Sequence, residues 1–159
     1  MHNLISRNSY LCTVKHIKME DLLTLDKQLC FPLYALSREV IQRYRPHLDE
    51  LGLTYPQYLV LMVLWENGKQ TVNQIGQKLL LDSGTLTPLL KRLEQKELLS
   101  RQRSTVDERV VDISLTVAGS DLKQKAMCIP GKLVSELGIT LEEVETMRNI
   151  AYKILYIKK

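Results

Sequence analysis

The sequence predicts a mainly α-helical fold with a small β-hairpin, an α+β protein of the winged helix-turn-helix type. Hydrophobic residues recur at the helical spacing of three and four positions over most of the chain. Two of these helical stretches, which begin near Thr71 and Asp82, are separated only by a tight polar connection, as in a helix-turn-helix. After Leu99 the period changes to two, which is typical of β-strands.

Composition limits the classes of function. The chain has 159 residues, of which 45% are hydrophobic and 25% are charged, and its formal net charge of +4 permits a nucleic-acid partner without requiring one. No apolar run approaches a membrane span and residues 1–7 do not resemble a signal peptide, so we expect a cytoplasmic protein without a membrane partner. Phosphate-binding loops, hydrolase motifs and metal-type cysteine spacings are absent from the sequence. We therefore expect no enzyme, no metal and no cofactor.

The chain starts with a segment that has no clear periodicity. We expect residues 1–18, including Cys12, to form a poorly ordered extension, and residues 19–159 to form a single domain. The first helical pattern covers residues 26 to about 44. Pro32 falls within it and either occupies the first turns, where proline is tolerated, or introduces a kink.

Capping boxes mark the beginnings of the next two helices. In both, a threonine is followed three residues later by a glutamine, as in Thr54 with Gln57 and Thr71 with Gln74. The helix after Thr54 is apolar on nearly all sides, so we expect it to lie in the core and to end at residues 67–68. The shorter helix after Thr71 is expected to direct its apolar side chains inward, namely Val72, Ile75, Leu79 and Leu80.

The helix after Asp82 and Ser83, which give a strong N-cap signal, is expected to be a DNA-recognition helix. Its inward stripe consists of leucines at helical spacing: Leu86, Leu89, Leu90 and Leu93. Its outer surface carries small residues first and cations later: Gly84, Thr85, Thr87, Pro88, Lys91, Arg92 and Gln95. Small residues near a helix N-terminus let free backbone N–H groups approach phosphates and base edges, and longer basic side chains reach phosphate oxygens. We therefore expect the short hydroxyl residues, Ser83 included, to approach bases and the cations to hold phosphate.

The strand-like segments are expected to form a β-hairpin with a polar tip at residues 105–109. Alternation in the second arm would turn three side chains to the core: Val111, Ile113 and Leu115. The intervening Asp112 and Ser114 would face solvent. Three cations lie on the hairpin: Arg101, Arg103 and Arg109. Beside a groove-reading helix, these cations favour contact with phosphates or with the minor groove, so the hairpin is interpreted as a wing.

Two further helices are expected after the hairpin. Thr116 caps a helix over residues 117 to about 127, which Ile129-Pro130-Gly131 breaks. The last helix begins at Thr140, where Glu143 completes a capping box.

The terminal helices are expected to mediate assembly. Residues 19–53 and 117–159 flank the winged helix-turn-helix of residues 54–116, and their apolar surplus predicts packing against a second copy of the chain. A two-fold homodimer would present its recognition helices to successive major grooves. The expected partner is therefore double-stranded DNA with a roughly palindromic operator.

Four stretches narrow this prediction: Gln28–Tyr34, Leu53–Tyr58, Leu81–Leu90 and Asp107–Arg109. Together with the order of the elements, they resemble the MarR family of winged-helix regulators, and in particular its organic-hydroperoxide-sensing OhrR branch. The resemblance covers roughly residues 25–116. It implies a MarR-type homodimer and adds Asp107 to the residues expected at the DNA.

The resemblance also implies a redox site at Cys30, which matches the peroxide-sensing cysteine of this branch. It further implies that Tyr34, Tyr44 and Tyr55 hydrogen-bond the sulfur, partly across the dimer interface. The chemistry is compatible, because Cys30 lies near the positive end of its helix, which favours the thiolate that attacks a peroxide to give sulfenic acid. Cys128 lies in the region of the resolving cysteine of two-cysteine members, and is either such a resolver or a buried structural thiol.

These observations predict a transcriptional repressor that leaves its operator when an organic hydroperoxide oxidises Cys30. Three alternatives stay open. The same fold can be controlled by reversible binding of a small aromatic ligand, as in other MarR relatives, or can serve as a broader oxidation-responsive virulence regulator similar to the staphylococcal proteins MgrA and SarZ. A thiol peroxidase is the alternative of another class, although a basic recognition helix and wing have no use in peroxide turnover.

Overall fold

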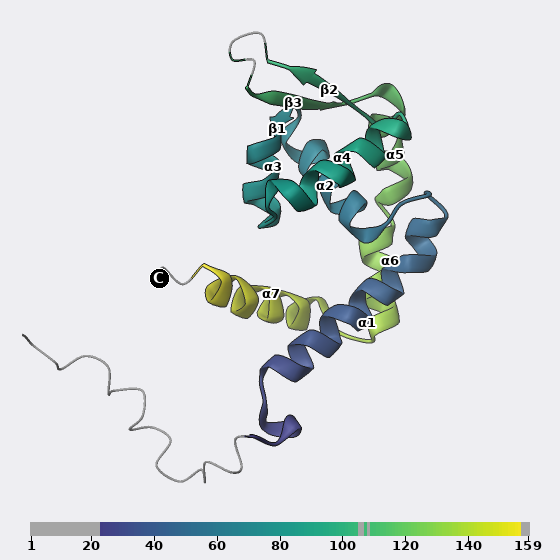
Figure 1. The fold of residues 1–159 in the computed structure, drawn as a ribbon. Helices are drawn as coiled ribbons and strands as arrows, with labels where there is room; N and C mark the ends of the chain where they lie inside the picture. Colours follow the sequence, from purple (N-terminus) through teal and green to yellow (C-terminus); the bar gives the residue numbers. More distant parts are fainter. Residues whose placement is uncertain (1–22, 105–106, 108, 157–159) are drawn as a thin grey trace, which may run out of the picture. The chain divides into compact units, whose positions relative to one another are not determined.

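The computed structural model describes residues 23–104, 107 and 109–156. The chain divides into two compact units, residues 1–40 and 41–159, and each is considered by itself. The extension expected at residues 1–18, with Cys12, lies outside the described residues. The elements of Figure 1 are a 3-10 turn at Leu25–Lys27, α1 (Cys30–Asp49), α2 (Tyr55–Asn67), β1 (Gln70–Thr71), α3 (Val72–Leu79), α4 (Ser83–Gln95), β2 (Leu99–Arg103), β3 (Val111–Leu115), α5 (Val117–Ala126), α6 (Ile129–Leu137) and α7 (Leu141–Leu155). A mainly helical chain with one small antiparallel sheet confirms the predicted fold class.

Helix α1 begins and ends later than the predicted range of residues 26–44. The preceding 3-10 turn is followed by an extended Gln28, with φ −85° and ψ 119°, and the α-helix starts at Cys30. Pro32 therefore lies in the first turn, where its missing N–H costs no helical hydrogen bond. The helix continues beyond the predicted end because Leu48, only 1% exposed, is anchored in the core of the second unit.

Side-chain caps begin α2, α3, α5 and α7 at the predicted residues. The N–H of Thr54 donates to Gln57 Oε1 at 3.1 Å, which is half of the capping box that opens α2. The same reciprocal arrangement opens α3 at Thr71 and α7 at Thr140, and Thr116 caps α5. These local interactions fix where each helix starts, independently of the tertiary contacts.

The inward direction predicted for Leu80 was wrong. This residue adopts a left-handed backbone conformation with φ 55° and ends α3, so the helical period no longer applies to it, and its side chain is 59% exposed. The other predicted positions of α3 agree with the structure, since Ile75 is buried while Val72 and Leu79 are half-buried against the core.

Helix α2 is the centre of the core of the second unit. It contacts α3, α4, α5 and β3, as expected for a helix that is apolar on nearly all sides. Its buried residues are Gln57, Tyr58, Val60, Leu61, Val63 and Leu64. The elements around α2 are thereby held in one packed body.

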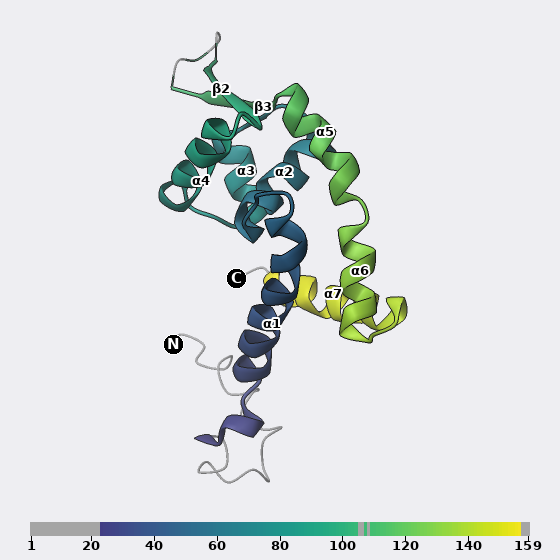
Figure 2. The ribbon, with the colours of Figure 1, turned by 90° about the vertical axis from the view of Figure 1, so that its right-hand side faces the viewer.

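The predicted hairpin is confirmed, and Figure 2 shows its two strands above α4. Ile113 is fully buried, and Val111 and Leu115 are half-buried against the core. Strand β1 also pairs with β3, which gives the sheet order β1-β3-β2. This third strand was not predicted, because the two residues of β1 are too few to show a period of two.

The prediction that Asp112 and Ser114 face open solvent was wrong. Asp112 Oδ2 lies 2.7 Å from Lys69 Nζ, and only 18% of the Asp112 side chain is exposed. Ser114 Oγ lies 3.0 Å from Ser100 Oγ on the neighbouring strand. Both residues are half-buried because polar partners cover this face of the hairpin. The tip positions 105, 106 and 108 lie outside the described residues.

The segment Ile129-Pro130-Gly131 begins a helix that was not predicted. A break does separate α5 from α6, but Pro130 lies in the first turn of α6, where proline is tolerated. Gly138, in a left-handed conformation, ends α6, and α7 follows its predicted cap. Within the described ranges, every helix is too short or too polar to cross a membrane.

Helix α5 comes close to the backbone of the preceding segment at Gly119. A Cβ atom at this position would lie 1.9 Å from the carbonyl oxygen of Leu98. The carbonyl of Gly119 accepts a hydrogen bond from Trp65 Nε1 at 2.8 Å. Only glycine fits here, because the obstructing atom belongs to the backbone and cannot rotate away.

Gly119→Ala should lower the free energy of unfolding by about 1–3 kcal/mol or more through overpacking, whereas helix propensity alone would raise it by about 1 kcal/mol. Urea unfolding followed by circular dichroism measures the sign of the change in the free energy of unfolding. Gly131→Ala in α6 is the matched control, because nothing lies within 4 Å of its Cβ position, and it should keep or raise stability. Equal effects at the two positions would contradict the close-contact explanation.

Candidate nucleic-acid interface and thiol site

The orientation of α4 is set by its leucines. Leu86, Leu90 and Leu93 are fully buried and Leu89 is half-buried, as the helical period predicted. Because this stripe faces the core, the opposite side of the helix lies at the surface. The structure thus leaves the predicted DNA-binding side chains of α4 accessible.

The short hydroxyl residues at the start of α4 are already engaged within the helix. Thr85 donates to the Asp82 carboxylate through its backbone N–H at 2.9 Å and its hydroxyl at 2.8 Å. These hydrogen bonds lower the pKa of Asp82 below its ordinary value. The Thr87 hydroxyl donates to the Ser83 carbonyl at 2.7 Å. The hydroxyl hydrogens of both threonines and the N–H of Thr85 are therefore already used, which leaves the hydroxyl oxygens as acceptors.

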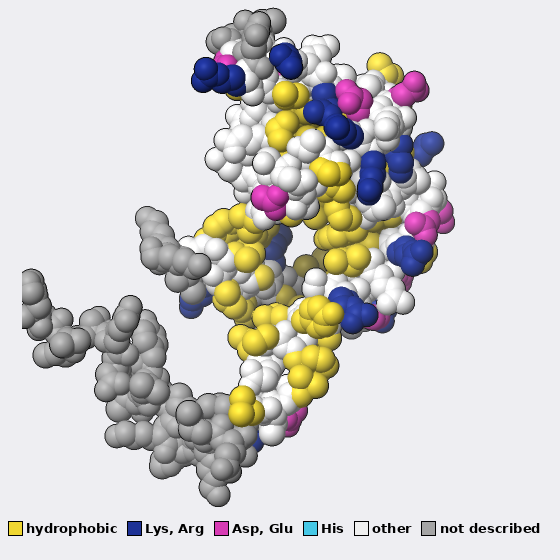
Figure 3. Space-filling view, viewed as in Figure 1, with side chains coloured by type: hydrophobic (Ala, Val, Ile, Leu, Met, Phe, Trp, Pro, Cys, Tyr) yellow, Lys and Arg dark blue, Asp and Glu magenta, His cyan; other side chains and the backbone are white. Residues whose placement is uncertain are grey.

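Basic side chains lie on this helix and on the wing that follows it. Figure 3 shows Lys and Arg side chains gathered on the wing and the adjoining surface. The exposed DNA-binding candidates are Ser83, Gly84, Thr85, Pro88, Lys91, Arg92, Arg103, Asp107 and Arg109, and Thr87 is half-buried. Asp107 Oδ1 accepts a hydrogen bond from the backbone N–H of Arg109 at 3.0 Å, so this aspartate stabilises the turn that carries the arginine.

Arg101 differs from the other cations of the wing. Only 21% of its side chain is exposed, and its guanidinium NH1 lies 3.7 Å from Glu94 Oε2 on α4. Its Nε is buried and has no hydrogen-bond partner among the described residues. An unsatisfied buried donor costs about 1–3 kcal/mol.

The thiol expected to sense peroxide is exposed in the first unit. Cys30 is the first residue of α1, as the sequence predicted from its place near a helix start. Tyr34 follows one turn later and is exposed, and its hydroxyl accepts a hydrogen bond from Arg38 NH1 at 3.4 Å. The Arg38 guanidinium also lies 5.5 Å from the centre of the Tyr34 ring, within reach of a cation–π interaction.

The other two predicted tyrosines meet in an aromatic cluster of the second unit. The ring centroids of Tyr44 and Tyr55 are 4.9 Å apart. Tyr58 lies 5.9 Å from Tyr44, and Trp65 lies 6.0 Å from Tyr58. Burial first, and the neighbouring Tyr55 and Tyr58 next, raise the pKa of Tyr44 to about 12. Tyr58 and Trp65 were not among the predicted site residues, although their spacing of seven places them on one face of a helix.

Cys128 lies between α5 and α6. Its thiol is exposed and lies 3.6 Å from the Lys125 carbonyl oxygen. The thiol is therefore not buried within a single chain.

The family described as transcriptional regulator SarA/Rot matches residues 39–126, more than half of the chain. The chain belongs to this family of transcriptional regulators. The regulator is 50% identical over 135 residues to the organic hydroperoxide resistance transcriptional regulator of Bacillus subtilis, covering 85% of this chain and 92% of the relative. It is 44% identical over 133 residues to the HTH-type transcriptional regulator SarZ of Staphylococcus epidermidis, covering 81% and 90%.

Solved structures agree with this assignment. The regulator is similar to reduced AbfR bound to DNA, with a TM-score of 0.76 and 37% identity over 89% of this chain and 99% of that one. It is also similar to the apo form of wild-type MarR from E. coli, with a TM-score of 0.65 and 26% identity over 80% and 96%. The prediction of a MarR-type winged-helix regulator similar to the OhrR branch is confirmed.

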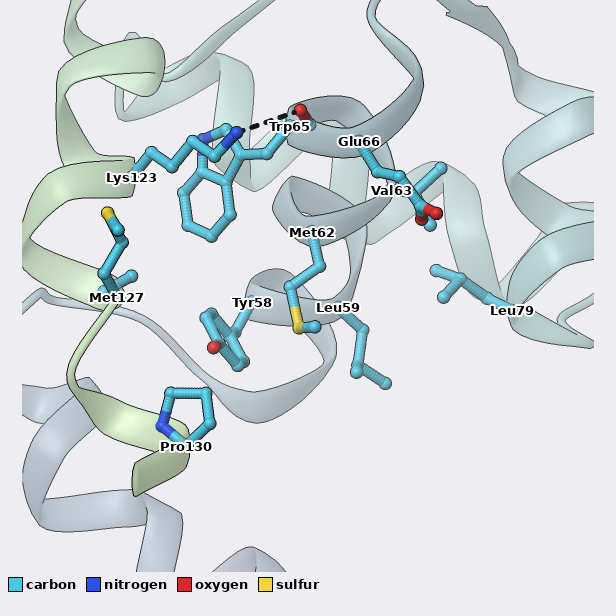
Figure 4. Close-up of a pocket in the computed structure, with 11 residues that line it drawn as sticks. Tyr58, Leu59, Met62, Val63, Trp65, Glu66, Leu79, Lys123, Met127 and Pro130 are labelled. Atoms are coloured by element: carbon cyan, nitrogen blue, oxygen red, sulfur yellow. Dashed lines mark hydrogen bonds between the residues drawn. The ribbon is translucent and has the colours of Figure 1, made fainter. Parts of the chain in front are cut away.

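The regulator also has an apolar pocket of about 510 Å³ beside α2 (Figure 4). Tyr58, Met62 and Trp65 contribute to its wall from α2, and Met127 from the segment that joins α5 to α6. Lys123 lies at the same pocket and donates to the Trp65 carbonyl at 3.3 Å. Its size and its aromatic and aliphatic walls suit a small apolar or aromatic molecule.

The raised pKa of Tyr44 predicts a loss of stability at alkaline pH. The neutral phenol is favoured in the folded state, so stability is fully present below the ordinary value of 10.0 and falls as the pH rises through about 12. Urea unfolding between pH 9 and 12 should show this decline, and Tyr44→Phe should weaken it. The exposed Tyr34→Phe is the control and should keep the wild-type slope. An unchanged slope in Tyr44→Phe would contradict the prediction.

Proposed function

We propose that the regulator is a homodimeric repressor that binds double-stranded DNA and releases it when an organic hydroperoxide oxidises Cys30. The observation that carries the proposal is α4, which buries its leucine stripe and exposes cations beside a basic wing. The similar AbfR, solved in reduced form on DNA, supports DNA as the partner. The name of the Bacillus subtilis relative supports an organic hydroperoxide as the signal.

A second copy of the chain would cover the apolar sides of the terminal helices. Exposed hydrophobic residues at α1 and α7 are Leu29, Phe31, Leu33, Leu36, Ile41, Met147, Ile150, Ile154 and Leu155. Large exposed apolar surfaces usually mark interaction sites in proteins. We assign residues 19–53 and 117–159 to dimerisation and residues 54–116 to DNA binding. A two-fold dimer would then favour a roughly palindromic operator.

The step at Cys30 is a two-electron oxidation. Its thiolate attacks the terminal oxygen of the hydroperoxide, an S–O bond forms, the O–O bond breaks, and the leaving alkoxide takes up a proton to become an alcohol. Cys128 of a second copy, or a small cellular thiol, would then attack the sulfenic sulfur and release water. Each Cys30 reacts once, so the reaction is a signal and not enzymatic turnover. We place the regulator in the cytoplasm.

In this proposal the tyrosines couple the oxidation of Cys30 to the release of DNA. Tyr34, Tyr44 and Tyr55 would hydrogen-bond the reduced sulfur, partly across the dimer. Oxidation changes the charge and size of the sulfur group and disturbs these bonds. The recognition helices and wings would then lose the spacing that fits successive grooves.

Cys30→Ser should leave DNA binding intact and abolish its release by hydroperoxide. Oxidation of the wild type should weaken binding about 5- to 150-fold, the usual range of allosteric coupling. The measurement is fluorescence anisotropy on a duplex that the wild type selects from a random library, before and after stoichiometric cumene hydroperoxide.

Cys128→Ser is the matched thiol control. If Cys128 is the resolver, this variant should still respond but should lack the intersubunit disulfide seen by non-reducing electrophoresis. Release of DNA from the oxidised Cys30→Ser variant would overturn the sensing role of Cys30.

The apolar pocket beside α2 favours a second candidate, control by reversible binding of a small aromatic acid. Tyr58 and Trp65 offer aromatic walls, and Lys123 offers a cation for a carboxylate.

Benzoate is a simple probe for this candidate. If the pocket controls DNA affinity, millimolar benzoate should weaken DNA binding of Cys30→Ser without any oxidant. Met62→Trp should remove that response by filling the pocket, while Leu141→Trp on exposed α7 should not. No effect of benzoate in calorimetry or anisotropy would count against an aromatic-acid ligand.

A further inference from the structure

We propose that Arg101 is a positioning residue that fixes the wing against the recognition helix and does not itself contact DNA. The inference rests on the proposed DNA-binding function and concerns how its two surfaces are aligned. The strand register provides the first argument. Arg101 lies directly opposite Ile113, and opposite residues of antiparallel strands point to the same face of the sheet.

That face is the core face. Ile113 is completely buried, and Leu99, two residues before Arg101 on the same side of β2, is also buried. Arg101 therefore extends from a core position of the hairpin, which explains why only 21% of its side chain is exposed. Arg103 lies on the same face, opposite Val111, but at the end of β2 it is exposed, as a cation that must reach a phosphate oxygen ordinarily is.

The contact with Glu94 gives this buried cation a partner on α4. Arg101 NH1 lies 3.7 Å from Glu94 Oε2, and the Arg101 Nε is buried without a hydrogen bond in the described part of the chain. Removing a partly buried guanidinium from water is unfavourable, and a hydrophobic residue would pack here at lower cost. The arginine is better explained by the geometry that its ion pair imposes than by stability.

The pair spans the turn that joins the two DNA-binding elements. Glu94 lies in the last turn of α4, and the chain then reverses through Glu97, which has a left-handed φ of 57°. The Leu98 N–H donates to the Leu93 carbonyl at 3.1 Å and closes this turn. An ion pair from α4 to β2 across the turn fixes the direction in which β2 leaves the helix. It therefore sets where Arg103, at the end of β2, meets the DNA.

The effect of Glu94→Gln on DNA affinity has opposite signs for the two possible roles of Arg101, positioning of the wing and contact with phosphate. If Arg101 positions the wing, the loss of its carboxylate partner should weaken binding to the selected duplex about 2- to 30-fold, as in other coupled networks. If Arg101 contacts phosphate, Glu94→Gln would release it, tighten binding and steepen the salt dependence.

Arg101→Met provides the complementary test. It should weaken binding to the selected duplex, leave binding to a scrambled duplex of the same composition within about twofold, and keep the slope of log K against log salt. Arg103→Met is the matched control, which should weaken both duplexes and flatten the slope by about one unit. Arg101→Lys should discriminate between the selected and the scrambled duplex better than Arg101→Met does, because lysine keeps the positive charge.

The outcomes are distinguishable. Failure of the wild type to bind any duplex would overturn the proposed function, whatever Arg101 does. A wild type that binds, with an Arg101→Met variant that flattens the slope or leaves discrimination between the duplexes unchanged, would overturn the positioning role. Urea unfolding of each variant shows the folded fraction, and Glu94→Gln decides the question if Arg101→Met does not fold.

Discussion

The burial of the α4 leucine stripe against α2 is the constraint on which the rest of the second unit depends. Leu86, Leu90 and Leu93 have no exposed surface, and each buried leucine contributes about 1.5–3 kcal/mol. The stripe can face the core in one rotation only, so the hydroxyls and cations of α4 must lie outside. Because β2 follows α4 after one tight turn, the same burial also determines where the wing begins.

Local features of the fold could be predicted from the sequence, and non-local ones could not. The caps at Thr71 and Thr140 involve residues three positions apart, which a sequence displays directly. Asp112 is covered by Lys69, which lies far away in the chain and adjoins a strand too short to show a period. Helix α6 was missed because a Pro-Gly pair fits a helix start as well as a break.

The candidate sites show the same contrast between local features, which the sequence predicts, and non-local ones, which it does not. Periodicity alone predicted the exposed side of α4, whereas the roles expected of Cys30 and the tyrosines came from the family resemblance. Arg101 looked like one more cation of the wing, because its inward direction depends on the register with Ile113. Tyr58 joins the aromatic cluster through Tyr44, which lies on another helix, and a contact between helices leaves little trace in the spacing of residues.

The cap of α4 also governs which part of this helix can face a phosphate. Asp82 accepts the N–H and the hydroxyl of Thr85, and these hydrogen bonds lower the pKa of its carboxylate. The partial positive charge of the helix dipole is thus neutralised within the protein. A phosphate at that end would meet the Asp82 carboxylate together with the helix dipole, so it would be attracted less than by a helix start without an acidic cap. The exposed flank of α4, with Lys91 and Arg92, is therefore better suited than its end to hold a phosphate.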